Sequence, residues 1–180
     1  MRTKTSDTEQ LVAGLQQGNR RAYVEAMNRY GRLVSSITGA MASDPRDVEE
    51  LTQDAFVRAF RTIGSFDSRK AALSTWLGRI AYNAAVDYLR RKGIRPAEYA
   101  AESLPEPPAE PDNMLSELLD DALELIAAEE RTALQLVYFD GMSLEEAAYV
   151  LDTNANALST RLYRIRNKLA RIINELKRKQ

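Results

Sequence analysis

The sequence contains no cysteine and no histidine among its 180 residues. The lack of cysteine excludes disulfides, zinc ribbons, iron–sulfur clusters and thiol nucleophiles. The lack of histidine excludes a Ser-His-Asp triad, an imidazole base and a His-ligated metal. A site built from carboxylates remains possible, but no pair of acidic residues comes with a group that would tune it. We therefore expect no catalytic residue, no metal and no cofactor.

Long apolar runs are also lacking. No stretch approaches the roughly 18 apolar residues that a membrane span needs, and the first seven residues, MRTKTSD, lack the apolar core of a signal peptide. The hydrophobic content of 44% is enough for a packed core. These features predict a cytoplasmic protein that does not insert into a membrane.

The charge is close to zero only on average. Residues 1–92 carry 15 basic and 10 acidic side chains, residues 93–130 carry one basic and 11 acidic, and residues 131–180 carry nine basic and five acidic. Basic ends around an acidic middle favour a polyanionic partner, of which nucleic acid is the common one. The alternative is that each basic stretch is only the solvated face of a helix.

Proline and acidic residues cluster in the middle of the chain. Five of the six prolines lie between Arg95 and Asp112, among five carboxylates. Proline breaks helices and like charges repel, so residues 93–113 are predicted to form an extended, flexible linker. It would separate one domain at residues 1–92 from a second at residues 114–180.

The first block has the apolar periodicity of helices. Asn19 and Asp44 each precede an apolar repeat and can cap it, Pro45 suits a first helical position, and Gly18 can end the helix before it. No run alternates apolar and polar residues long enough to predict a sheet. The expected helices cover residues 7–17, 20–37, 45–63 and 73–92. The predicted fold class is all-α, with a helical bundle at this end.

The second block ends in a helix-turn-helix pattern. A helical region starts near Leu115 and runs to Gly141, and Ser143 and Glu146 then form a capping box for a short helix. A turn at residues 152–154 leads into a long helix whose apolar positions, from Leu158 to Leu176, are spaced 4, 3, 4, 3 and 4. This order is typical of DNA-binding helix-turn-helix bundles.

Polar side chains on the long helix suit nucleic acid. Its basic residues lie about 100° around the helix from the apolar stripe, so one face can pack while another meets phosphates. Its first turns offer small hydrogen-bonding groups suited to base edges. The alternative is a solvated basic helix. Four basic residues form this stripe: Arg161, Arg164, Lys168 and Arg171.

Two helices of the first block carry candidate binding faces. The helix at 73–92 mixes aromatic and basic groups, which suits stacking of unpaired bases, although Trp76 and Tyr82 equally fit a core. The helix at 45–63 has an acidic and polar side that is either a docking face for a protein or only solvated.

The order of these pieces resembles bacterial sigma factors of the extracytoplasmic-function (ECF) group, over about residues 9–173. Residues 47–60 (DVEELTQDAFVRAF) resemble the family's stretch that binds core RNA polymerase. Residues 65–69 (SFDSR) and 73–92 (LSTWLGRIAYNAAVDYLRRK) resemble its segment that reads and melts the minus-ten element. Residues 138–148 (YFDGMSLEEAA) and 157–166 (ALSTRLYRIR) resemble its helix-turn-helix for the minus-thirty-five element.

The resemblance implies a role for each matching position. The residues implied to dock on the clamp helices of the large polymerase subunit are Asp47, Glu50, Leu51, Gln53, Asp54 and Phe56. Those implied to face the minus-ten strand are Phe66, Arg69, Trp76, Arg79 and Asn83. Those implied to meet the minus-thirty-five element are Asn154, Asn156, Ser159, Arg161 and Arg164. It also implies contact with the polymerase flap and regulation by an anti-sigma protein.

Two residues depart from the family pattern. Asp152 stands in the turn where the family usually has glycine, and Ser159 stands where a basic residue is common. Other classes remain open on residue patterns alone. One is a stand-alone helix-turn-helix regulator that binds duplex DNA without polymerase, and another is an all-helical scaffold or anti-sigma-like interaction protein.

Overall fold

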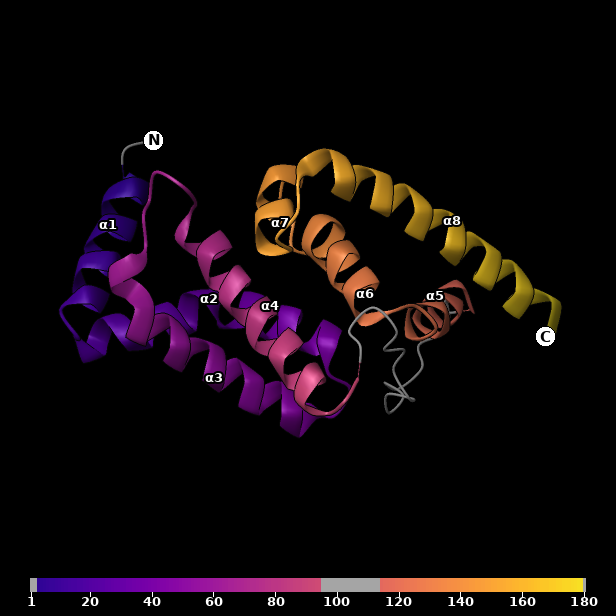
Figure 1. Ribbon diagram of the computed structural model, residues 1–180, viewed down its shortest axis with the longest axis horizontal. Helices are drawn as coiled ribbons and strands as arrows, with labels where there is room; N and C mark the ends of the chain where they lie inside the picture. The colour runs from indigo at the N-terminus through magenta and orange to yellow at the C-terminus, as the bar shows by residue number, and fades with distance from the viewer. Residues whose placement is uncertain (1–2, 95–113, 180) are drawn as a thin grey trace.

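The computed structural model describes residues 3–94 and 114–179, and these residues fold entirely as helices and turns, with no strand among them. The predicted all-α fold is confirmed, and Figure 1 shows its helices in two groups. The first group holds α1 (Thr3–Gln16), α2 (Arg20–Met41), α3 (Pro45–Thr62) and α4 (Leu73–Arg91). The second holds α5 (Met114–Glu124), α6 (Ala128–Leu134), α7 (Leu144–Val150) and α8 (Ala155–Lys179).

Local capping residues fix the starts of three of the helices. The Asn19 side chain accepts a hydrogen bond from the Arg21 amide at 2.9 Å, and that of Asp44 accepts one from the Arg46 amide at 2.8 Å. Ser143 forms a reciprocal capping box at the start of α7. Because these side chains satisfy amides that the helix leaves unpaired, they set the first turns of α2, α3 and α7 as predicted.

Two expectations meet a different outcome, and a third falls outside the described residues. The first helix begins at Thr3, earlier than the predicted start near residue 7. The helical region after the linker is not continuous: it breaks at residues 125–127 and closes with a π-helical turn, η2 (Gln135–Phe139). The predicted flexible linker at 93–113 lies outside the described residues from position 95 onward.

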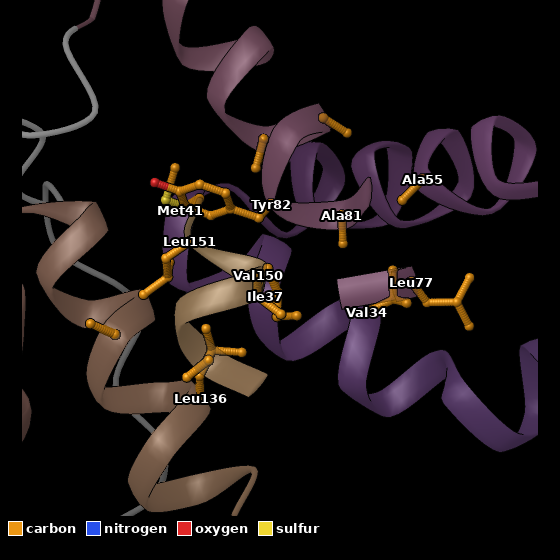
Figure 2. Packing of buried hydrophobic residues seen from close by; sticks show 14 of the residues in the cluster. Val34, Ile37, Met41, Ala55, Leu77, Ala81, Tyr82, Leu136, Val150 and Leu151 are labelled. Carbon is orange, nitrogen blue, oxygen red and sulfur yellow. The ribbon is translucent and has the colours of Figure 1, made fainter. Parts of the chain in front are cut away.

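One apolar core runs through both groups of helices. The central helix α4 packs against α2 and α3 on one side and against α7 on the other, while α2 also contacts α6. Figure 2 shows Val34 and Ile37 of α2 and Leu77 of α4 in the same cluster as Leu136 and Val150 from the second group. The sequence pattern identified apolar faces but did not predict that the two halves share a core.

Close approach and a few polar contacts join the two halves. A Cβ atom added at Gly78 of α4 would lie 3.2 Å from Ile37 and 3.2 Å from Val150, so glycine allows α7 to approach this closely. The Ser36 hydroxyl donates to the Asp140 carboxylate at 3.0 Å. Burial raises the pKa of Asp140 above its usual value. The hydrogen bond from Ser36 counteracts part of this rise.

The Thr75 hydroxyl provides a test of the core. Its side chain is 2% exposed, and its oxygen has no hydrogen-bond partner among the residues that the structure describes. An unsatisfied buried hydroxyl is costly, so we expect Thr75→Val to raise the free energy of unfolding by about 1 kcal/mol in urea denaturation. Thr38 is the matched control, because its equally buried hydroxyl lies 2.9 Å from that of Thr52 and its valine variant should be destabilised. Equal losses in both variants would contradict this prediction.

Candidate nucleic-acid interface

The polar face of α3 brings together four of the six predicted docking residues. Glu50 and Gln53 are exposed, and Asp47 and Asp54 are partly exposed beside them. The remaining two do not reach this surface, because Leu51 and Phe56 are 2% and 3% exposed in the core. In this conformation Leu51 and Phe56 position α3, and only the polar members can touch a partner.

Asp47 is tied to the far end of α4. Its carboxylate accepts a hydrogen bond from the Tyr88 hydroxyl and another from the Lys92 ammonium at 2.9 Å. The Lys92 ammonium also lies 4.6 Å from the centre of the Tyr88 ring. Tyr88, followed by Lys92, holds the pKa of Asp47 below its usual value. Asp47 therefore stays ionised and fixes α3 against α4.

The loop before α4 is ordered by its own side chains. The Asp67 carboxylate accepts hydrogen bonds from the Arg69 backbone amide at 3.0 Å and from its guanidinium at 2.8 and 2.9 Å. These bonds lower the pKa of Asp67. Phe66 packs edge-on against Trp76, with ring centroids 5.5 Å apart. Two of the predicted minus-ten residues therefore contact each other, while Arg69 stays exposed at the loop.

Arg79 is the predicted minus-ten residue with an unexpected environment. Its guanidinium is 2.5 Å from the Asp152 carboxylate, donates to the Tyr149 carbonyl at 3.3 Å, and lies 4.9 Å from the centre of the Tyr149 ring. All three partners belong to α7 or to the turn after it. Asn83, one turn further along α4, is exposed.

The turn between α7 and α8 depends on two polar residues. Asp152 has a positive φ of 54°, which is the left-handed conformation that favours glycine. The Asn154 side chain accepts a hydrogen bond from the Ala157 amide at 2.8 Å and so caps α8. Of the small polar groups predicted to meet bases, Asn156 and Ser159 are exposed, and Asn154 is engaged by the helix start.

The four residues of the predicted basic stripe on α8 divide into two sets. Arg161 pairs with Glu129 at 2.9 Å and Lys168 pairs with Glu130 at 2.7 Å, both across to the start of α6. Arg164 is exposed, and Arg171 bonds the backbone of its own helix. A surface hollow of about 660 Å³ lies near the start of α8, and the polar residues that line it are Glu130, Asn156, Thr160, Arg161 and Arg164. Three of the five predicted upstream-element residues, Asn156, Arg161 and Arg164, therefore line this hollow.

Sequence reasoning missed the residues that organise these surfaces across the chain. The sequence pattern assigned no role to Glu129 and Glu130, yet they pair with Arg161 and Lys168 of α8. Tyr82 lies in the core near Glu129, where burial first and that carboxylate second raise its pKa to about 12. No local pattern signals such pairs; the one hint was Gly78, a glycine inside an otherwise strong helix.

The fold and these surfaces define an all-helical protein with a capped helix-turn-helix and an exposed basic face on its second helix. Two family descriptions match the chain in this order: Sigma-70 region 2 over residues 26–94 and Sigma-70, region 4 over residues 116–169. The chain belongs to the sigma-70 family of RNA polymerase sigma factors, in the ECF group.

Curated relatives match almost the whole chain. The RNA polymerase sigma-H factor of Pseudomonas aeruginosa is 28% identical, with 99% of each chain covered. The ECF RNA polymerase sigma-E factor of Escherichia coli K12 is 31% identical over 88% of this chain and 90% of its own. Members of this family recognise promoters as subunits of RNA polymerase.

Solved structures share the fold. The sigma factor RpoE from Bartonella quintana, in complex with the anti-sigma factor NepR, has a TM-score of 0.68 at 22% identity and covers 84% of this chain and 96% of that one. CnrH, in complex with the cytosolic domain of CnrY, has a TM-score of 0.66 at 24% identity, with 93% and 97% covered. Among the described helices of the present chain, none combines the length and apolar character of a membrane span.

Proposed function

We propose that this chain binds core RNA polymerase in the cytoplasm, directs it to promoters with minus-ten and minus-thirty-five elements, and helps to melt the DNA there. The order of the two matched regions on two helical groups is the observation that carries this proposal. Residues 1–92 would bind polymerase and the minus-ten element, residues 114–180 would bind the minus-thirty-five element, and residues 93–113 would join them.

Each surface has a proposed binding partner. The exposed polar side of α3 would dock on the clamp of the large polymerase subunit, with the second half of the chain reaching the flap. On α4 and the loop before it, exposed Arg69 and Asn83 would contact the minus-ten strand, and the Phe66–Trp76 pair would support capture of an unpaired base. On α8, exposed Asn156, Ser159 and Arg164 would meet the upstream element, with Asn154 and Arg161 alongside them.

Neither half of the chain would need to bind DNA tightly by itself, because both halves would contribute to the affinity of one complex. Polymerase would hold both halves close to one DNA, so binding at one element would raise the effective concentration at the other. Stacking of unpaired bases on aromatic groups would offset part of the cost of melting.

A protein that covers these surfaces would keep the chain inactive. Two proteins of the same fold were each solved with a bound partner. RpoE was solved with the anti-sigma factor NepR, and CnrH with the cytosolic domain of CnrY. We therefore include an anti-sigma protein among the proposed partners, alongside polymerase and promoter DNA in duplex and single-stranded form.

Footprinting tests the proposal directly. DNA containing a promoter should be protected at both elements when the chain and core polymerase are present together, and at neither with the chain or core alone. Protection by the chain alone would instead indicate a regulator that binds duplex DNA without polymerase.

The α3 surface gives a second prediction. We expect the double variant Gln53→Ala with Asp54→Ala to weaken binding to core polymerase by about 1–3 kcal/mol, because it removes polar groups at the centre of the proposed contact. Binding should be measured by titration of labelled chain with core enzyme. Since Gln53 is exposed and Asp54 partly so, thermal stability should change little.

The control is Glu25→Ala, an exposed acidic position on α2 away from this face. Unaltered affinity for polymerase in the double variant would remove α3 from the proposed contact. A large fall in melting temperature would show that the two residues act through folding.

A further inference from the structure

The contact around Arg79 joins a proposed promoter-binding residue to the other half of the chain. In Figure 1, α7 lies between α4 and α8. Arg79 projects from α4 to the Asp152 carboxylate, the Tyr149 carbonyl and the Tyr149 ring. The positive group that would meet a DNA strand is therefore occupied by an anion, a carbonyl and an aromatic face of the same molecule.

Asp152 is the unusual member of this contact. A φ of 54° costs most residues other than glycine conformational energy, and Asp is one of the few for which this cost is small. The turn itself does not need the carboxylate, which instead accepts a hydrogen bond from Arg79 across the interface. Glycine would form the same turn without strain, so what the aspartate adds is the ion pair between the two halves.

The rest of the interface places α7 over the same part of α4. Gly78, the neighbour of Arg79, lies against Val150, and a Cβ there would be only 3.2 Å from its side chain. Ser36 bonds Asp140, and the Arg131 guanidinium donates to the Ala40 carbonyl at 3.2 Å. Each of these other contacts is apolar or has a neutral group on at least one side. The Arg79–Asp152 pair is the ion pair that links α4 to the turn.

We propose that Asp152 is a latch: its carboxylate takes the place of a nucleic-acid anion at Arg79 and holds the chain, when alone, in a closed form that competes with promoter DNA. The inference rests on the proposed function, because Arg79 lies in the α4 segment that is proposed to bind the minus-ten strand. Opening requires that Arg79 exchange Asp152 for DNA or that polymerase hold the two halves apart. The latch is partly exposed, so it is a modest bias that salt weakens.

Energy transfer within the full chain tests the latch. The sequence has no cysteine, so Gly39→Cys and Leu125→Cys supply two unique dye sites, both exposed and on opposite sides of the Arg131–Ala40 contact. Asp152→Asn keeps tolerance of the left-handed backbone and removes the charge. We expect it to lower transfer efficiency and to raise the affinity for a random pool of single-stranded DNA by roughly two- to fivefold, the range that an exposed ion pair supports.

Two further variants sharpen the test. Glu145→Gln removes the same charge from an exposed position on α7 and should change neither transfer nor affinity. Arg79→Gln removes the other charge of the pair, and combining it with Asp152→Asn should lower transfer efficiency no further than either variant alone.

The outcomes separate the latch from the function. Unchanged transfer in Asp152→Asn, or lower transfer with unchanged DNA affinity, would overturn the inference. If the parent chain supports no initiation by core polymerase, the proposed function fails, while the transfer measurement still reports whether Asp152 closes the molecule.

Discussion

Replacement of Arg164 by alanine is expected to weaken binding of the polymerase-held chain to the minus-thirty-five element by about 1–3 kcal/mol, or roughly 5- to 150-fold. Arg164 is exposed on α8 beside the hollow that Asn156 and Thr160 line, so its guanidinium is available to a base edge or a phosphate. Affinity should be measured by competition between templates that differ at single positions of the element.

Arg161→Ala is the informative comparison. This side chain is held by Glu129, so its removal also leaves a partly buried carboxylate without its partner. We expect a similar loss of affinity together with a lower melting temperature, whereas Arg164→Ala should keep the melting temperature of the parent. If Arg164→Ala leaves both affinity and sequence preference unchanged, α8 does not read the element through this residue.

Replacement of Trp76 by alanine should have two large effects at once. The ring is partly buried and packs against Phe66, so its loss should lower the free energy of unfolding by about 2 kcal/mol. If the same ring supports base capture, affinity for single-stranded minus-ten DNA should fall by about 1–3 kcal/mol as well. Trp76 is the only tryptophan in the chain, so its fluorescence reports DNA binding by the parent directly.

Trp76→Phe separates the two effects. An aromatic ring of smaller size should recover most of the stability and part of the stacking. A phenylalanine variant that is stable but as poor in DNA binding as the alanine variant would assign the indole a direct contact. An alanine variant with reduced stability and unaltered DNA binding would make Trp76 purely structural.

Local chemistry explains why much of the fold could be predicted. Asn19, Asp44 and Ser143 act on amides two or three residues away, so the sequence alone indicates where α2, α3 and α7 begin. The regular spacing from Leu158 onward likewise predicts α8. The break at residues 125–127 has no proline or glycine to mark it, and it was missed.

Long-range contacts explain why parts of the candidate site could not be predicted. Leu51 and Phe56 share a helix with polar docking residues, but only packing against other helices shows that they are buried. Arg79 pairs with a residue 73 positions away, and Arg161 with one 32 positions away. Charge patterns indicate that such side chains can bind an anion, but the fold decides which anion lies within reach.

Run-off transcription with core RNA polymerase, over a library of promoter templates and with or without this chain, tests the central claim most directly. We predict transcripts that start at defined sites only when the chain is present, and that are lost when either the minus-ten or the minus-thirty-five element is scrambled. Initiation that is the same with and without the chain on every template would contradict the account.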